Sequence, residues 1–176
     1  MTLNLVEASI SELQHALSSG HTTSVDLVAR YLHRIALYDR REIKQGPLSE
    51  ALNSIPILNP AVFDEATASD ARRAKDQSRG PLEGIPYTIK DSMMYAGMTC
   101  ASASPAFENL VAKDDCFVAT QLRAAGAVCM GRTNTPPMMA SGMHRGLFGR
   151  AESPYNLEYL TAAFSSGSSN GSATST

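Results

Sequence analysis

The sequence predicts an α/β fold in a single domain, and three observations carry this prediction. A β-prone run at 85–89, a helical segment at 114–126 and an apolar run at 127–131 follow one another, as in a βαβ unit. The first 79 residues show amphipathic helical periodicity. With 176 residues, 43% hydrophobic and 18% charged, the chain is long enough for one core. We therefore expect N-terminal helices over 1–79 and the start of an α/β core over 80–176.

Two short amphipathic helices are predicted first. Ser9 and Glu12 have the spacing of a capping box, so the first helix should begin there and end before Gly20. Its apolar face is expected to consist of Ile10, Leu13 and Leu17. A second capping box spans 23–26. The stripe that follows it is formed by Leu27, Val28, Tyr31, Leu32 and Ile35.

An irregular connection and a third helix are predicted next. Residues 40–60 mix charges with Gly46 and three prolines, which favours irregular structure. Asn59 and Pro60 have the pattern of a helix N-terminus, and the Ala-rich charged stretch after them suits a helix interior. This helix should end near Arg79 and Gly80.

The predicted βαβ unit places polar residues where sites are usually built. Lys90 ends the first strand, and the turn 132–134 follows the second. Asp114 is expected to cap the intervening helix, which Gly126 closes. Loops at the carboxyl ends of parallel strands form the binding sites of α/β proteins. We therefore expect a site near Lys90 and 132–134.

Composition argues against several classes of function. The net charge of −2, with scattered Lys and Arg, lacks the basic footprint of a nucleic-acid-binding protein. The three cysteines form no CxxC pair and the four histidines no cluster, so neither a disulfide framework nor a metal site is predicted. There is no apolar run long enough to span a membrane and no basic leader. We expect a cytoplasmic protein with free thiols and no membrane partner.

Two features leave the chemistry open. Lys90 follows apolar Ile89, so partial desolvation could favour its neutral form and make it a general base, although most lysines at strand ends are simply solvated. Asp91 would hold the ammonium charged if it pointed at the amine. The Ser-Gly run 163–176 is compatible with a disordered tail, a phosphate-binding loop or a catalytic serine loop. Composition alone favours the tail.

Three segments in order resemble one family. "GPLEGIPYTIKDSMMYAGM" is similar to the block of the amidase signature family that reads close to G-P-L-x-G-I-P, a short strand, Lys and Asp. "DDCFVATQLRAAGAVCMGRTNTPPM" resembles its next block, with L-R-x-A-G-A, a strand and G-[KR]-T-N-x-P. "AESPYNLEYLTAAFSSGSSNGSA" is similar to the stretch that leads into its G-G-S-S-G-G-S loop. The resemblance covers Gly80 to the end and implies a mixed central sheet flanked by helices.

The resemblance implies a Ser-Ser-Lys arrangement that cleaves carboxamide bonds through an acyl-enzyme, without metal or organic cofactor. Lys90 matches the lysine of the family, and Ser168 matches the bridging serine that follows a cis peptide bond. Ser169 would support this network by hydrogen bonding, and Asn134 and Met139 would lie near the substrate cleft. The substrate would be a small-molecule amide.

This sequence also departs from the family pattern. Ser166 and Asn170 replace two glycines of the loop, and Asn tolerates a positive φ better than most residues. The attacking serine and the oxyanion-hole donors of the family would lie past Thr176, so no nucleophile is assigned here. We therefore expect a truncated domain that is inactive alone. The alternatives are an amidotransferase A-like subunit fragment and a non-catalytic remnant or binding protein. Exposed apolar edges would favour self-association or a homo-oligomer.

Overall fold

The computed structural model describes residues 3–140, 144–162 and 166–176, and it contains five α-helices and five strands within these ranges. The helices are α1 (Ile10–Ser18), α2 (Ser24–Arg34), α3 (Val62–Arg73), α4 (Phe117–Ala124) and α5 (Asn170–Ser175). The strands are β1 (Ile43–Gln45), β2 (Leu48–Glu50), β3 (Ile57–Leu58), β4 (Pro86–Lys90) and β5 (Val128–Thr133). Short π or 3-10 turns are η1 (Ile35–Asp39), η2 (Pro105–Phe107) and η3 (Pro137–Met139).

A mixed three-stranded sheet lies at the centre, in the order β3-β5-β4. Strands β4 and β5 are parallel and joined through α4, so the predicted βαβ unit and the α/β class are confirmed. Strand β3 pairs antiparallel to β5. This pairing depends on Gly131, because a Cβ there would lie 2.3 Å from the Ile57 carbonyl oxygen.

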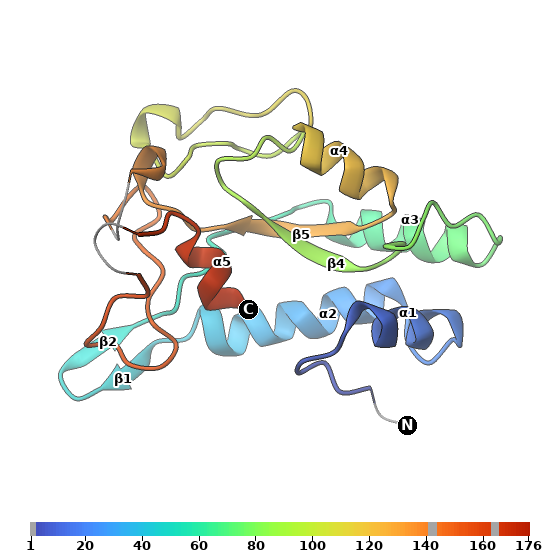
Figure 1. Cartoon of the computed structure of the whole chain (residues 1–176), viewed down its shortest axis with the longest axis horizontal. Helices are drawn as coiled ribbons and strands as arrows, with labels where there is room; N and C mark the ends of the chain where they lie inside the picture. The colour runs from blue at the N-terminus through green and yellow to red at the C-terminus, as the bar shows by residue number, and fades with distance from the viewer. Residues whose placement is uncertain (1–2, 141–143, 163–165) are drawn as a thin grey trace.

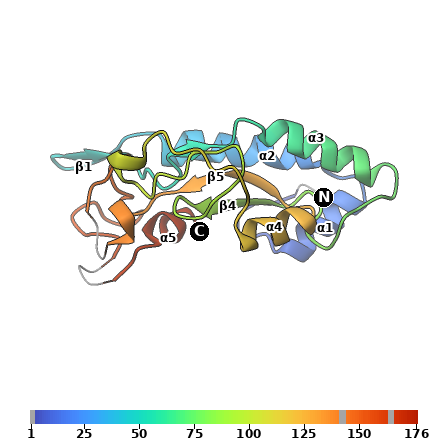
Figure 2. The ribbon, with the colours of Figure 1, turned by 90° about the horizontal axis from the view of Figure 1, so that it is seen from above.

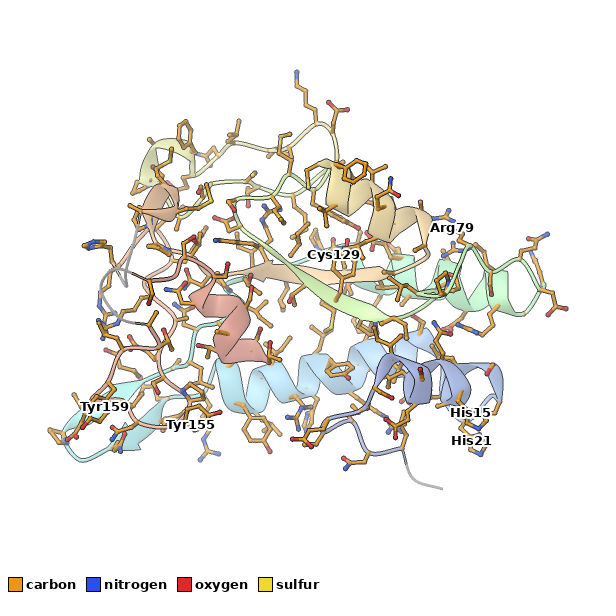
Figure 3. The ribbon with its side chains drawn as sticks, viewed as in Figure 1. His15, His21, Arg79, Cys129, Tyr155 and Tyr159 are labelled. Carbon is orange, nitrogen blue, oxygen red and sulfur yellow. The ribbon has the colours of Figure 1, made fainter. Side chains whose placement is uncertain are left out.

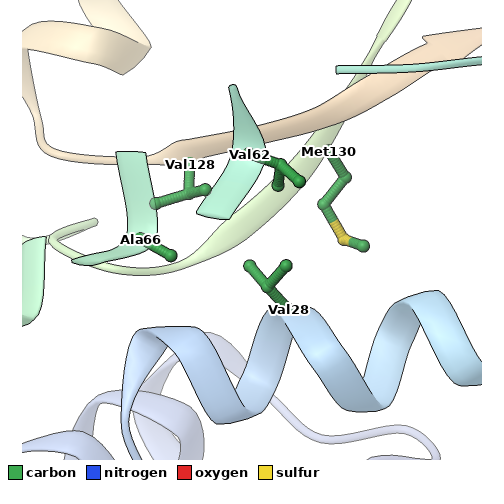
Figure 4. Close-up of a cluster of buried hydrophobic side chains, with 5 residues drawn as sticks. All are labelled: Val28, Val62, Ala66, Val128 and Met130. Carbon is green, nitrogen blue, oxygen red and sulfur yellow. The ribbon is translucent and has the colours of Figure 1, made fainter. Parts of the chain in front are cut away.

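Helices cover both faces of the β4–β5 pair, with α2 and α4 on opposite sides (Figure 1) and α3 alongside α2 (Figure 2). On one face, Val128 and Met130 of β5 pack against Val28, Val62 and Ala66 of the two helices (Figure 4). Side chains alternate along a strand. Cys129 therefore points to the other face (Figure 3), into the cluster formed by Ile89, Tyr95, Met98 and Ala119.

The first two helices form where they were predicted. Ser9 and Glu12 make both hydrogen bonds of a capping box at the start of α1. The Thr23 side chain accepts from the Asp26 N–H at the start of α2, whereas the Asp26 carboxylate accepts from the Thr22 hydroxyl. One expected core residue is wrong, since Ile10 is 53% exposed. The buried face of α1 is formed by Leu13, Ala16 and Leu17 instead.

Three further expectations are wrong, which concern the end of α3, the start of α4 and the connection 40–60. Helix α3 ends at Arg73, not near Arg79, because Asp76 takes a left-handed φ of 54° and turns the chain away. Asp114 does not cap α4, whose N-cap residue is Cys116 and lacks a side-chain cap. The connection 40–60 contains the hairpin β1–β2 and strand β3, which are too short for a periodic signal.

The segment 144–162 packs against this hairpin, and Tyr155 and Tyr159 lie beside it (Figure 3). The Leu157 N–H donates to the Gln45 side chain at 2.8 Å.

None of the helices in the described ranges has the length and apolar character needed to cross a membrane.

Candidate active site

Lys90 and Ser168 meet at the carboxyl end of β4. Lys90 is the last residue of the strand and lies opposite Thr133 in the parallel register. Its Nζ lies 2.5 Å from Ser168 Oγ and 3.2 Å from Ser169 Oγ. The 78-residue separation is closed because α5, which follows the serine loop, packs on both β4 and β5. The structure therefore brings together the three residues that the resemblance selected.

The surroundings of Lys90 favour its neutral form. Burial lowers the pKa of the Lys90 amine. Asp91, the adjacent carboxylate, points elsewhere and accepts from Arg132 Nε at 3.0 Å and from the Ala103 N–H at 2.8 Å. The question that the sequence left open is thus resolved, because Asp91 does not pair with the amine. Desolvation raises the pKa of Asp91, while the Ala103 N–H and Arg132 oppose this rise.

The serine run is ordered where it is described, so its interpretation as a tail is wrong. The peptide bond between Gly167 and Ser168 is cis, as the resemblance implies. Ser168 is half-buried, Ser169 is exposed, and α5 begins at Asn170. The tolerance of Asn170 for a positive φ is therefore not used, since this residue is helical. Residues 163–165, which open the run, lie outside the described residues.

Asn134 supports the serine loop from below. It is 1% exposed, and its side chain donates to the Asn53 carbonyl at 3.0 Å and accepts from the Thr135 N–H at 2.8 Å. Its own carbonyl oxygen accepts from the Gly171 N–H at 3.1 Å. A Cβ on Gly171 would lie 2.3 Å from the Asn134 nitrogen. Asn134 is thus a buried support of the serine loop, and its place near a substrate cleft stays a prediction.

Two further contacts concern the expected site. Thr133 Oγ1 lies 3.0 Å from Ser172 Oγ and joins the end of β5 to α5. Met139 is 47% exposed, with a φ of 58°, and its neighbour Met138 donates its N–H to the Ser102 carbonyl. Met139 is accessible to a ligand, and its place at a cleft stays a prediction.

The sequence places Arg132 in the turn 132–134 but assigns it no role of its own. The side chain is 0% exposed and lies beside the strand end that carries Lys90. Its signal in the sequence was weak, because a charged residue after an apolar run usually marks the exposed end of a strand. Only the tertiary contact between Arg132 Nε and Asp91 Oδ1, at 3.0 Å, shows that the two side chains face each other.

Metal and thiol chemistry find little support in the residues that the structure describes. Within 3–140, 144–162 and 166–176, no three His, Cys, Asp or Glu side chains are grouped so as to hold a metal ion. The three cysteines are free thiols, and burial raises the pKa of the Cys129 thiol to about 12.

These observations define an α/β protein with a lysine–serine site at the end of a parallel strand pair. Comparisons with known proteins identify its family. The amidase family model matches residues 26–176, and the chain belongs to the amidase family.

Several relatives resemble most of the chain. It is 35% identical to a glutamyl-tRNA(Gln) amidotransferase subunit of Roseiflexus sp., over 96% of this chain and 32% of that protein. It is 32% identical to a putative amidase of Schizosaccharomyces pombe, over 94% of this chain and 28% of that protein. The crystal structure of native peptide amidase from Stenotrophomonas maltophilia matches with a TM-score of 0.82 and 33% identity, over 96% of this chain and 33% of that one. The chain thus spans about a third of the length of these relatives.

Proposed function

We propose that this chain contributes the base and the proton relay of an enzyme that cleaves the C–N bond of small carboxamides. The observation that carries the proposal is the 2.5 Å contact between Lys90 Nζ and Ser168 Oγ. Membership of the amidase family supports it. The lowered pKa of Lys90 supports it further, because a general base must be neutral before it can take a proton.

The proposed mechanism moves one proton along this contact. Neutral Lys90 takes the proton of the Ser168 hydroxyl, which in turn takes the proton of an attacking serine that adds to the amide carbonyl. The leaving amine receives the proton by the reverse route, and an acyl-enzyme remains. Water then releases the acid, with Lys90 again serving as base through Ser168. Ser169 holds the Lys90 amine from a second side, at 3.2 Å.

The attacking serine and the oxyanion donors are not assigned to any residue of 1–176. We therefore expect a polypeptide of these 176 residues alone not to hydrolyse simple aryl or alkyl amides. Loss of a single oxyanion-hole donor already costs about 10²- to 10³-fold in rate. Turnover by this polypeptide that Lys90→Ala abolishes would contradict this expectation.

An amidotransferase role is the second candidate, and the relatives named as subunits of glutamyl-tRNA(Gln) amidotransferase favour it. In that role the same lysine–serine relay would release ammonia for a partner to use. A non-catalytic binding protein is the third candidate. It predicts that an amide ligand binds and is never cleaved. We also place the protein in the cytoplasm, which its free thiols favour.

The test is ammonia release from small carboxamides by the protein expressed from its gene. We expect Lys90→Met and Ser168→Ala each to lower kcat by at least about 100-fold, as for loss of general base catalysis. Ser175→Ala, at an exposed position of α5, is the matched control and should keep its activity. Unchanged kcat in either site variant would refute the proposed roles, and ammonia release that requires an added acceptor would favour the amidotransferase role.

A further inference from the structure

A wholly buried ion pair lies directly behind the lysine–serine site. Arg132 and Asp91 are both 0% exposed, and Arg132 Nε lies 3.0 Å from Asp91 Oδ1. Replacing such pairs by apolar residues is often neutral or stabilising, since removing two charges from water costs more than their attraction returns. Stability is therefore a weak explanation for this pair, and its position suggests another role.

Arg132 holds the backbone that presents Lys90. Its Nη2 group donates to the Asp91 carbonyl at 2.9 Å and to the Met93 carbonyl, and it also lies 3.4 Å from the carbonyl of Lys90, the last residue of β4. The Met93 N–H closes the same turn on the Lys90 carbonyl at 2.9 Å. A planar guanidinium with several fixed donors suits this task better than a flexible ammonium. The strand end that carries the amine is thus held from the protein interior.

Arg132 also keeps the adjacent carboxylate away from Lys90. Consecutive side chains of a strand point to opposite faces, and Arg132 and the Ala103 N–H occupy both oxygens of Asp91 on the far face. The part of the chain that the structure describes contains no carboxylate within 4.0 Å of the Lys90 amine. The amine is then free to act on Ser168.

The elements packed around β4 also bring polar and titratable groups near it. The serine loop and α5 present hydroxyls and amides, and Cys100 of the following segment donates to the Asp91 carbonyl at 3.4 Å. Helix α2 also packs on β4, and its titratable or charged residues are Asp26, Arg30, Tyr31, His33 and Arg34. Asp26 pairs with Arg30 at 3.0 Å within that helix. The ion pair, by contrast, is joined directly to the strand end that carries Lys90, through the contact of Arg132 Nη2 with the Lys90 carbonyl.

We propose that Arg132 and Asp91 form a positioning unit that sets the reactivity of the Lys90 amine. It holds the backbone of the strand end and cancels the charge of the neighbouring carboxylate. The inference rests on the proposed function only in taking Lys90 as the reactive base. Neither residue touches a substrate, so both act through Lys90.

The test measures the reactivity of each lysine by trace acetylation with an N-hydroxysuccinimide ester at one mildly alkaline pH, read by peptide mass spectrometry. Lys44, Lys75 and Lys113 are exposed and serve as internal references in every sample. No catalytic turnover is needed, so failure of this inference is distinguishable from failure of the proposed function.

The two halves of the pair should shift Lys90 in opposite directions. Asp91→Asn leaves Arg132 uncompensated, which disfavours the ammonium form, so Lys90 should react at least about threefold faster relative to the references, as for half a pKa unit. Arg132→Met leaves the carboxylate uncompensated, and Lys90 should react at least about threefold more slowly. A structural role alone would move both variants in the same direction.

Two further variants complete the design. Asp115→Asn breaks a partly exposed pair with Arg123 on α4 and should leave the relative reactivity of Lys90 unchanged. If Arg132→Met does not fold by circular dichroism, Asp91→Asn alone decides the matter. Faster acetylation of Lys90 in Asp91→Asn supports the proposal. Slower or unchanged acetylation there, or a shift of the same sign in both variants of the pair, overturns it.

Discussion

Lys90 combines two properties that the sequence could suggest only separately. Its position after an apolar strand predicted partial desolvation, and the resemblance predicted a serine partner. Both properties belong to the Lys90 amine in the structure, because burial lowers its pKa and its Nζ lies 2.5 Å from Ser168 Oγ. A desolvated lysine without a carboxylate partner is destabilised as an ammonium ion. We therefore expect the charged form of Lys90 to lower the stability of the folded protein.

This cost predicts a pH dependence of stability. The pKa of Lys90 in the folded protein lies below the unfolded value of about 10.4. Between these two values the unfolded chain binds more protons, so stability rises with pH. Lys90→Met removes this dependence. We expect the advantage of Lys90→Met in unfolding midpoint to be largest at neutral pH and to shrink as pH rises through the pKa of Lys90.

Thermal unfolding followed by circular dichroism over this pH range measures the effect. The control is Lys113→Met, the same substitution at an exposed position. A Lys90→Met difference that is constant with pH would contradict the lowered pKa.

At the scale of elements, the contacts between α5 and Asn134 determine where Ser168 lies. The helix rests on Asn134 through the Gly171 N–H, and Asn134 is held in turn by the carbonyls of Asn53 and Ser54. Ser54 is fixed by Asp39, which accepts from its N–H at 2.6 Å and from its hydroxyl. The serine loop is therefore located by a chain of contacts that crosses four separate segments.

The substitution Gly171→Ala tests the contacts that hold α5 in place. In an ordinary helix the change would stabilise by about 1 kcal/mol. Here the new Cβ would lie 2.3 Å from the Asn134 nitrogen and 2.7 Å from the Ser54 oxygen, both backbone atoms that cannot turn aside. We expect a net loss of about 2 kcal/mol in the free energy of unfolding by urea, typical of overpacking.

Ser175→Ala on the exposed side of the same helix is the control and should change the free energy by less than about 0.5 kcal/mol. A stabilised Gly171→Ala variant would show that α5 does not pack this closely against Asn134 and Ser54.

Most elements could be predicted, and the errors have physical causes. Capping signals located α1 and α2, and apolar runs located β4 and β5, because these signals are local. The end of α3 was misjudged because the left-handed φ of Asp76 is not required by its residue type. The hydrogen bonds that Asp115 accepts from Ala96 and Arg123 could not be predicted, because neither donor is next to Asp115 in the sequence.

At the scale of the whole molecule, the sheet and helix surfaces predict association. Strands β3 and β4 are the outer strands of the sheet, and a depression of about 780 Å³ lies beside β4, lined in part by Tyr31, Ile35 and Thr88. On α4, Phe117 is 78% exposed and Val118 44% exposed. Exposed apolar surface and unpaired strand edges both favour contacts between molecules.

We expect the 176-residue chain to self-associate with rising concentration in sedimentation velocity. Phe117→Asp should weaken this association at least about tenfold, which corresponds to about 1.4 kcal/mol. Gln121→Asp adds the same charge to an exposed position of α4 without removing apolar surface, and serves as the control. A chain that stays monomeric at all concentrations, or equal effects of the two variants, would contradict the prediction.

The sequence by itself determined the α/β class, the strand–helix–strand order and the selection of Lys90, Ser168 and Ser169 by family resemblance. Each depends on local periodicity or on a motif of neighbouring residues. Only the tertiary structure decided that residues 166–176 form a serine loop and α5 beside Lys90, that Asn134 is buried against α5 and that Asp91 pairs with Arg132. The physical reason is that these contacts join residues 37 to 81 positions apart, whose pairing depends on strand register and helix packing.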